Sequence, residues 1–292
     1  MTRDGFIEVN GGKVWYQRND LGIKKTPVIV LHGGPGSSHY SMQGLKVLAE
    51  QRPVIFYDQL GCGKSERPTD ESLWHIDRFV EELGQVRKAL SLDEVHILGH
   101  SWGTTLAAAY MLTKPEGVKS VIFSSSCLSA PLWAEDQERN RQKLPTDVQE
   151  TLTTAETNGT TDSQEYKDAT HEFNKRFVCR IDPWPEFLKK GAHLKNGEVY
   201  NIMWGPSEFH VTGNLKKFDC TQRLKEINVP ILYTCGRHDE ATPESTEYYH
   251  SLTPNSKFHV FENSAHIPYL EEPKEYIRVV GDFLEEVDLD SN

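Results

Sequence analysis

A serine between two glycines is the first feature of this chain that could do chemistry. The stretch ILGHSWGTTLA places Ser101 between Gly99 and Gly103, where an apolar run ends and an alanine-rich run begins. Small flanking residues let a strand and the following helix approach closely, so that the residue at the turn projects outward. A helix N-terminus also favours negative charge developing on that residue. The pattern predicts that Ser101 is a nucleophile rather than an ordinary turn residue.

A serine hydroxyl needs a base, and a histidine base needs an acid to hold its tautomer. His266 follows the apolar run KFHVFEN in a short loop, and Asp239, otherwise a helix-capping residue, follows VPILYTCG. His238 competes as the base, but its neighbour Asp239 has the stronger claim to a function. His100 adjoins the serine, and because adjacent side chains on a turn point apart, we expect a structural role for it. Asp58 also ends an apolar run, but it is not expected to be the acid, because it precedes the serine and so breaks the chain order Ser, Asp, His.

An oxyanion formed by attack on a carbonyl needs two backbone N–H donors. The residue after the nucleophile, Trp102, provides one. The motif HGGPG (32–36) follows the apolar run PVIVL, and its glycines can turn an N–H inward without a side chain in the way. Gly34 is the expected second donor. These residues together predict a serine hydrolase.

Short runs rich in Val and Ile, separated by helical patterns, predict the elements that position these side chains. Lack of strict alternation is typical of strands buried on both faces, and strands alternating with helices indicate a mainly parallel α/β sheet. The first residues predict a hairpin turning at Gly11-Gly12. The expected strands are 27–32, 53–58, 94–100, 118–126, 229–236 and 257–263, and the expected helices include 76–90, 102–113 and 273–287.

One connection is far longer than a crossover needs. About a hundred residues separate Ser126 from Val229, and they contain polar amphipathic patterns instead of apolar runs. We expect a helical cap at 128–217, inserted into a core domain formed by 1–127 and 218–292. The stretch 151–164 is its most loop-like part, and the acidic tail 285–292 is expected to be frayed.

Charge and composition narrow the class of protein. The net charge of −11 disfavours nucleic acid and anionic membranes as partners, and no segment has the roughly 18 apolar residues that cross a bilayer. The five cysteines form no CxxC pair, so a disulfide framework or zinc site is not expected. Without an apolar leader in MTRDGFIEVNGG, we expect a cytoplasmic protein.

Four motifs together resemble the proline iminopeptidase family of α/β hydrolases. They are LHGGPGSSH (31–39), YDQLGCGKS (57–65), GHSWGTTLA (99–107) and WGPSEFHVTGN (204–214). The likeness extends over nearly the whole chain. One departure is Thr104, where the family usually has a glycine, and we expect it to affect helix packing more than chemistry.

The resemblance implies an α/β-hydrolase fold with Ser101, Asp239 and His266 as the triad, and Gly34 and Trp102 as oxyanion donors. It also implies that two glutamates bind the free amine of the substrate. These are Glu208, in the GPxEF motif, and Glu240, directly after the acid of the triad. An N-terminal amine is largely protonated near neutral pH, so a carboxylate pair suits it. The implied reaction removes N-terminal residues, proline above all, from short peptides without metal or organic cofactor.

Two alternatives remain open at this point. The same triad could serve an amino-acid amidase, an esterase or a lactonase, or the fold could be a non-catalytic ligand-binding receptor. The lining of the cap would decide between substrates. Aromatic residues that could form a proline-sized slot there are Trp133, Phe177, Trp184, Trp204 and Phe209.

Overall fold

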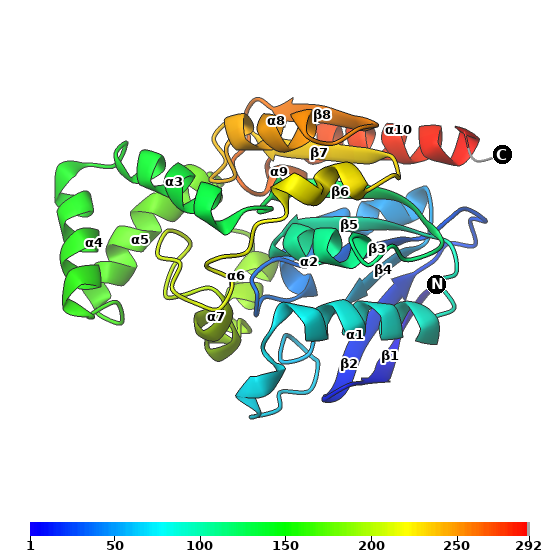
Figure 1. Ribbon diagram of the computed structural model, residues 1–292, viewed down its shortest axis with the longest axis horizontal. Coiled ribbons are helices and arrows are strands. Elements are labelled where there is room, and N and C mark those ends of the chain that lie inside the picture. Colours follow the sequence, from blue (N-terminus) through cyan, green and yellow to red (C-terminus); the bar gives the residue numbers. More distant parts are fainter. Residues whose placement is uncertain (291–292) are drawn as a thin grey trace.

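The computed structural model describes residues 1–290, which form one twisted, mostly parallel sheet with helices on both faces (Figure 1). The strand order in the sheet is β1-β2-β4-β3-β5-β6-β7-β8, and only the pairs made by β2 are antiparallel. The strands are β1 (Thr2–Val9), β2 (Gly12–Asn19), β3 (Val28–Leu31), β4 (Val54–Tyr57), β5 (Val95–Ser101), β6 (Val118–Ser126), β7 (Ile231–Gly236) and β8 (Ser256–Phe261). The expected α/β sheet is confirmed, with each of the six apolar runs forming one of the strands β3 to β8.

Helices pack on the sheet because successive strand residues face opposite sides. In β3, Ile29 and Leu31 belong to one apolar cluster with α1 and α2, whereas Val28 and Val30 belong to another with η1 and α10. The helices are η1 (His39–Glu50), η2 (Glu71–Leu73), α1 (Ile76–Ala89), α2 (Trp102–Met111), α3 (Ala130–Arg141), α4 (Thr146–Asn158), α5 (Gln164–Phe177), α6 (Glu186–His193), α7 (Gly197–Met203), η3 (Thr221–Glu226), α8 (Pro243–Ser251), α9 (Pro268–Glu271) and α10 (Pro273–Asp290).

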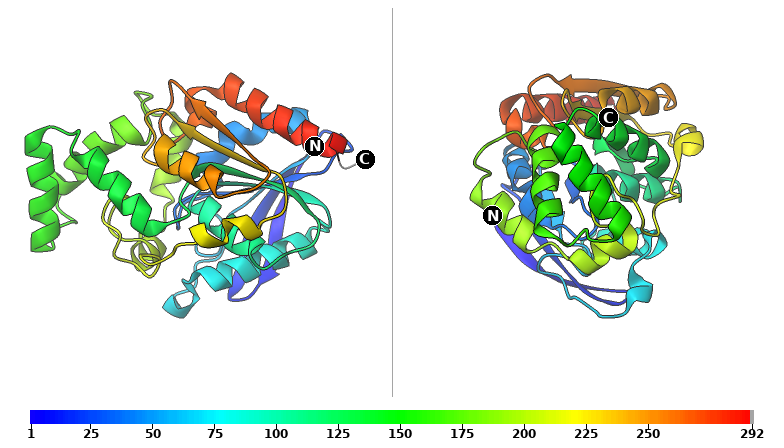
Figure 2. Two further views of the ribbon diagram at one scale, coloured as in Figure 1. Left: turned by 45° about the horizontal axis from the view of Figure 1, so that its top comes forward. Right: turned by 90° about the vertical axis from the view of Figure 1, so that its left-hand side faces the viewer.

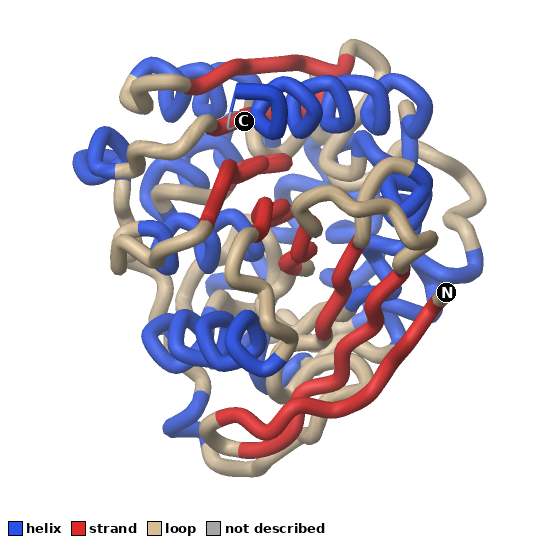
Figure 3. Tube along the Cα trace, turned by 90° about the vertical axis from the view of Figure 1, so that its right-hand side faces the viewer, coloured by secondary structure: helices blue, strands red, loops and turns tan. Residues whose placement is uncertain are grey.

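The two edges of the sheet are formed by the β1–β2 hairpin and by β8. The β1–β2 hairpin forms, but Val9 pairs with Gly12, so the turn lies at Asn10-Gly11, one residue earlier than expected (Figure 3). Asn-Gly is the favoured pair for a tight hairpin turn. At the other end, β8 is an edge strand whose residues are largely half-buried, because no further strand covers it.

The segment at 128–217, called the cap segment below, holds α3 to α7, and its outer helices α4 and α5 extend away from the sheet (Figures 1 and 2). The chain enters and leaves it side by side, since Ser129 pairs with Asp219 and the N–H of Ala130 donates to the carbonyl of Phe218. The prediction of a loop at 151–164 is wrong for most of its length, because α4 continues to Asn158.

Threonine side chains explain that error. The hydroxyls of Thr151, Thr153 and Thr157 each donate to the carbonyl four residues earlier, which satisfies them on the exposed face of α4. On the other face, Leu152 and Ala155 pack into a small apolar cluster with α5. Packing therefore stabilises a helix that its polar sequence does not suggest.

The expected frayed tail is also wrong up to residue 290, because α10 continues to Asp290. Asp288 accepts hydrogen bonds from Arg52 and His96, which fix the last turns of the helix against the core. Residues 291–292 lie outside the described residues. Within residues 1–290, no helix is both long enough and apolar enough to cross a membrane.

Candidate active site

Ser101 lies at a sharp turn between β5 and α2, with φ 55° and ψ −124°. A positive φ is strained for a residue other than glycine, and the surrounding packing enforces it. A Cβ on Gly103 would lie 2.2 Å from the carbonyl oxygen of Leu31, and one on Gly99 would lie 2.3 Å from the oxygen of Gly103. Both glycines are therefore sterically required for the strand, the turn and the helix to pack as they do.

Thr104 ties this turn to the neighbouring strand end. Its hydroxyl donates to the carbonyl of Ser101 at 2.7 Å and accepts from the N–H of Cys127 at 2.9 Å. Thr104 thus makes two buried hydrogen bonds to the main chain at this turn.

His266 and Asp239 come from the loops after β8 and β7 and meet beneath the cap segment. The Nδ1 atom of His266 lies 2.7 Å from Oδ1 of Asp239, whose carboxylate also accepts from the N–H groups of Ala241 and Gly236. Both side chains are buried. A carboxylate on Nδ1 leaves Nε2 as the nitrogen that can take a proton.

The group that faces Nε2 of His266 is a carboxyl group. Nε2 of His266 lies 3.5 Å from Oε1 of Glu240. Ser101 and His266, both in the described part of the chain, are not joined by a hydrogen bond. The ring of His100, the residue before the serine, lies 4.7 Å from that of His266. Catalytic hydrogen bonds often tighten only when substrate binds.

His100 holds the main chain of His266. Its Nε2 lies 2.7 Å from the carbonyl oxygen of His266, which also accepts from the hydroxyl of Ser125 at 3.0 Å. Burial, with a smaller contribution from His266, lowers the pKa of His100 to about 3. His100 is therefore a neutral donor, which agrees with the structural role expected for it.

The two expected oxyanion donors lie at one small cavity. Gly34 and Trp102 line it together with Ser101. The glycine turn is packed directly on the serine, because a Cβ on Gly33 would come within 3.2 Å of the Cβ of Ser101. Gly34 has φ 122°, a backbone conformation that residues with a side chain rarely adopt.

Glu208 lines the same cavity, and Glu240 lies beside it. Glu208 accepts a hydrogen bond of 2.7 Å from the hydroxyl of Tyr200. Glu240 is 1% exposed, and its Oε2 has no hydrogen-bond partner. Burial raises the pKa of Glu240 well above its usual value, and the nearby charges of Glu208 and Asp239 raise it further. An unpartnered buried carboxyl oxygen favours a cationic ligand.

A lysine of the cap segment approaches the same carboxyl groups. The Nζ atom of Lys195 lies 3.1 Å from the ring centroid of Tyr200. Desolvation of the ammonium lowers the pKa of Lys195, although the charges of Glu208 and Glu240 act in the opposite direction. The ammonium is thus desolvated against the ring of Tyr200, although Lys195 as a whole residue is exposed.

The cap segment also supports the loops that carry the site. The N–H of Glu240 donates to the carbonyl of Phe177, and that of His266 donates to the carbonyl of Val178. The side chain of Gln137 donates to the carbonyl of Glu240 at 2.9 Å. The positions of the catalytic loops therefore depend on the cap as well as on the sheet.

The five candidate aromatic residues divide into separate groups. Trp133 and Trp204 line the cavity at Ser101, and the indole N–H of Trp133 donates to the carbonyl of Glu208. Phe177 and Phe209 instead belong to the apolar core of the cap, and Trp184 lines a different surface pocket. Only the two tryptophans are placed to contact a substrate at the serine.

The comparison with known proteins agrees with this arrangement. Residues 26–273 match the model of the α/β hydrolase fold. A proline iminopeptidase of Heyndrickxia coagulans is 68% identical over 288 residues, which cover 98% of this chain and 100% of that protein. The chain belongs to the proline iminopeptidase family of α/β hydrolases.

Other members of the proline iminopeptidase family extend the likeness. The protein of Clostridium botulinum is 41% identical over 268 residues, 90% of this chain and 91% of its own length. The crystal structure of the Mycobacterium smegmatis proline iminopeptidase has a TM-score of 0.92 at 34% identity, covering 99% of this chain and 100% of that chain. The resemblance expected from four motifs is confirmed.

Sequence reasoning missed several polar residues that surround the site. Gln59 contacts both His32 and Trp102, and Lys195 and Tyr200 approach the glutamates. Gln59 lies in the motif DQLGCGKS, which offered a signal, but the others carry none in the sequence. Among residues 1–290, no group of three or more His, Cys, Asp or Glu side chains could hold a metal ion.

Proposed function

We propose that this protein is a serine peptidase that releases N-terminal proline, and other small or apolar first residues, from short peptides through an acyl-enzyme. The observation that supports it most is that Ser101, Gly34, Trp102 and Glu208 line a single cavity. A nucleophile, two oxyanion donors and an amine-binding carboxylate are thereby within the length of one residue of substrate. The family's named activity points the same way.

In the proposed reaction, Ser101 attacks the carbonyl of the first residue while Nε2 of His266 takes its proton. The negative oxygen accepts hydrogen bonds from the N–H groups of Gly34 and Trp102. His266 then gives the proton to the leaving amine, and water hydrolyses the ester on the serine by the same route. Asp239, already bonded to Nδ1, stabilises the imidazolium that forms in each step.

Glu208 and Glu240 select substrates with a free amine. An ammonium group between them would give the unpartnered Oε2 of Glu240 a donor and offset the repulsion between the carboxyls. It would also draw Oε1 of Glu240 away from Nε2 of His266, which it faces at 3.5 Å. A blocked N-terminus brings no charge and leaves the carboxyls unpaired.

The division into a core domain (1–127 and 218–292) and a helical cap domain (128–217) belongs to this proposal. It is supported by the paired entry and exit of the chain at Ser129 and Asp219. The cap covers the serine, which is 8% exposed, so an internal stretch of polypeptide has little room to pass through. The arrangement favours removal of single residues from a chain end.

The proposed partners are small peptides or amino-acid amides, without nucleic acid, membrane or a resident cofactor. We also propose a cytoplasmic location, because all five cysteines are buried thiols without a disulfide, as in a reducing compartment.

The test is release of product from anilides of proline, alanine and phenylalanine, their N-acetylated forms, the matching amides, and an aryl ester. We expect turnover of free-amine substrates and none of blocked ones. Ser101→Ala should remove activity, whereas Ser163→Ala, at the half-buried N-cap of α5, should not. Comparable turnover of acetylated substrates would overturn the amine anchor. Preference for amides would favour an amidase, and inactivity on every substrate would favour a receptor.

A further inference from the structure

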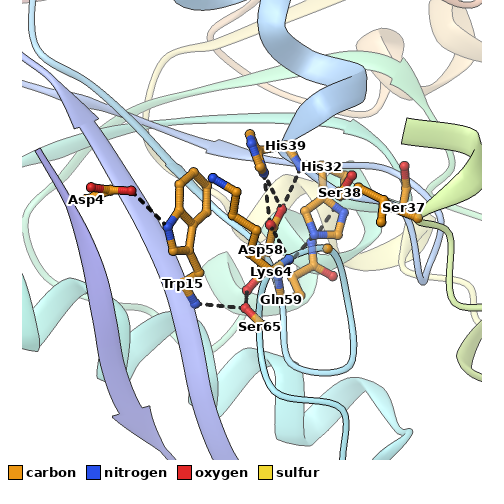
Figure 4. Close-up of polar contacts among 12 residues, drawn as sticks. Asp4, Trp15, His32, Ser37, Ser38, His39, Asp58, Gln59, Lys64 and Ser65 are labelled. Carbon is orange, nitrogen blue, oxygen red and sulfur yellow. Dashed lines mark hydrogen bonds and ion pairs between the residues drawn. The ribbon is translucent and has the colours of Figure 1, made fainter. Parts of the chain in front are cut away.

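Gln59 is a fully buried glutamine directly after Asp58, at the end of β4 (Figure 4). Its Oε1 accepts a hydrogen bond of 2.8 Å from the indole N–H of Trp102, and its Nε2 donates to the carbonyl of His32 at 3.2 Å. An indole N–H can only donate and a carbonyl can only accept, so the orientation of the amide is fixed. Gln59 thus joins the ends of two strands, β3 and β5.

The main chain of Gln59 makes a third link. Its N–H donates to Nε2 of His32 at 3.1 Å, so the ring proton must be on Nδ1, which lies 2.8 Å from the carbonyl oxygen of Gly33. Burial lowers the pKa of His32, which keeps its ring neutral and Nε2 able to accept. The result is a chain of hydrogen bonds from Gln59 through His32 to Gly33.

That chain ends on the peptide unit that carries a proposed oxyanion donor. The carbonyl of Gly33 and the N–H of Gly34 belong to one planar trans peptide, in which they point in opposite directions. Holding the Gly33 oxygen toward His32 therefore turns the N–H of Gly34 the other way. Gly34 lines the cavity at Ser101, where an oxyanion would form.

The second proposed donor is attached to the same amide. The main-chain N–H of Trp102 begins α2, and the side chain of this residue is held by Oε1 of Gln59. The two donors come from segments 68 positions apart in the chain, at Gly34 and Trp102. One buried amide contacts the supports of both.

We infer that Gln59 is a positioning residue for catalysis, which sets the relative placement of the two oxyanion donors without touching the substrate. This inference rests on the proposed function, because it assumes that Gly34 and Trp102 stabilise an oxyanion. A purely structural glutamine would affect stability alone. A positioning residue affects the transition state more than substrate binding.

The principal variant is Gln59→Leu, with kcat and KM measured separately on a proline anilide. We expect kcat to fall by about 10- to 100-fold while KM stays within about twofold, because oxyanion contacts exist only in the transition state. A boronic-acid analogue of proline, which forms a tetrahedral adduct, should lose affinity by a similar factor. Binding of free proline, which forms none, should be unchanged.

Two further variants keep the inference testable if Gln59→Leu folds poorly. Trp102→Phe removes the indole donor together with part of a buried ring, and should lower kcat several-fold. In the double variant the two losses should be less than multiplicative, because they remove the same link. Val95→Ala, at the opposite end of β5, is the matched control, since it is buried and should lower stability without changing kcat.

The outcomes separate this inference from the proposed function. If Gln59→Leu retains wild-type kcat and boronate affinity, or loses both only in proportion to the unfolded fraction, the positioning role is wrong. If instead Ser101→Ala keeps wild-type turnover, or the wild-type protein binds no boronate, the proposed function itself fails.

Discussion

Within residues 1–290, two Asp–His pairs have both partners buried, and their difference shows what makes such a pair catalytic. In one, Nδ1 of His266 lies 2.7 Å from Asp239; in the other, Nδ1 of His39 lies 2.9 Å from both oxygens of Asp58 (Figure 4). Each aspartate follows a parallel strand of the sheet. The pairing chemistry is the same, so the surroundings must decide their roles.

The Asp58 pair lies among aromatic rings and main-chain N–H groups, and neither of its residues lines the cavity at Ser101. The ring of His39 lies between those of Trp15 and Tyr40, at 4.3 and 4.1 Å between centroids. The carboxylate of Asp58 also accepts from the N–H groups of His39 and Lys64. Its contacts join the loop after β3 to the loop after β4, which is a structural task.

The Asp239 pair lies close to the cavity of the serine instead. Nε2 of His266 faces Glu240 at 3.5 Å, near the cavity that contains Ser101. Trp133 of the cap lies edge-on to the imidazole, with 5.9 Å between ring centroids. An Asp–His pair is therefore a candidate base only where its second nitrogen lies near a nucleophile and the place of a substrate.

The largest expected effect comes from replacing each aspartate by asparagine. Asp239→Asn should lower kcat by about 10³- to 10⁴-fold, because an amide no longer holds the tautomer with Nε2 free. Asp58→Asn, its matched control, should leave the kcat of the folded fraction within about threefold. Steady-state kinetics on a proline anilide checks both. Equal losses of kcat in the two variants would contradict the division of roles.

The next largest effect concerns the amine site beside the catalytic pair. Glu208→Gln and Glu240→Gln should each raise KM for free-amine substrates by about 10- to 100-fold, since each removes one of the two carboxyl groups proposed to bind the ammonium. Turnover of a simple aryl ester should change little. Glu135→Gln, on the exposed face of α3, is the control that should do nothing. Parallel losses on amine and ester substrates would count against the anchor.

The Asp58–His39 pair should contribute to the stability of the fold. Burial opposes ionisation of Asp58, but hydrogen bonds and charge from His39 outweigh it and lower the pKa of this carboxyl below 3.8. A lowered pKa stabilises the fold above that value, and the gain is lost as pH falls through the folded-state pKa. Asp58→Asn should cost about 2–4 kcal/mol of unfolding free energy at pH 7.

Denaturant unfolding at several pH values measures that difference. The gap between the wild type and Asp58→Asn should shrink below pH 3.8, where the unfolded carboxyl is protonated. A gap that stays constant from pH 7 to pH 3 would mean that the charge of Asp58 does not contribute.

A smaller effect is expected at His100, which forms a hydrogen bond with the main-chain carbonyl of His266. Its pKa falls from 6.5 to about 3 on folding, so the unfolded chain binds a proton that the native protein excludes. Stability is therefore lost as pH falls from 6.5 towards 3, by up to about 1.4 kcal/mol per unit. His100→Gln, whose amide can still donate to His266, should show a shallower loss. His193→Gln, at an exposed residue, should lose stability with falling pH as the wild type does. If His100→Gln shows the same loss as the wild type, protonation of His100 does not oppose folding.

The same comparison marks what the sequence could reveal. Asp58 and Asp239 both end apolar runs, and only the chain order Ser, Asp, His separated them. The strands were predictable because buried parallel strands have continuous apolar runs. The helix α4 was not, because its stability depends on packing by Leu152 and Ala155 and on hydroxyl bonds within the helix.

The site shows the same limit. Ser101, Asp239 and His266 are each marked by a strand end, a turn and a residue type, which are local features. The contacts of Gln59 with His32 and Trp102 depend on distances between three strand ends, and no local pattern encodes them. The proximity of Glu240 to Nε2 of His266 is likewise a property of the folded loops.

The central claim is that the Asp239–His266 pair activates Ser101 toward substrates held by their amine. The most direct test is acid quenching during turnover of an activated proline ester, followed by mass spectrometry of the peptide that contains Ser101. The account predicts a prolyl group on Ser101 that is absent with the N-acetylated ester and absent in Asp239→Asn. A prolyl group on another residue, or equal labelling by the blocked ester, would contradict it.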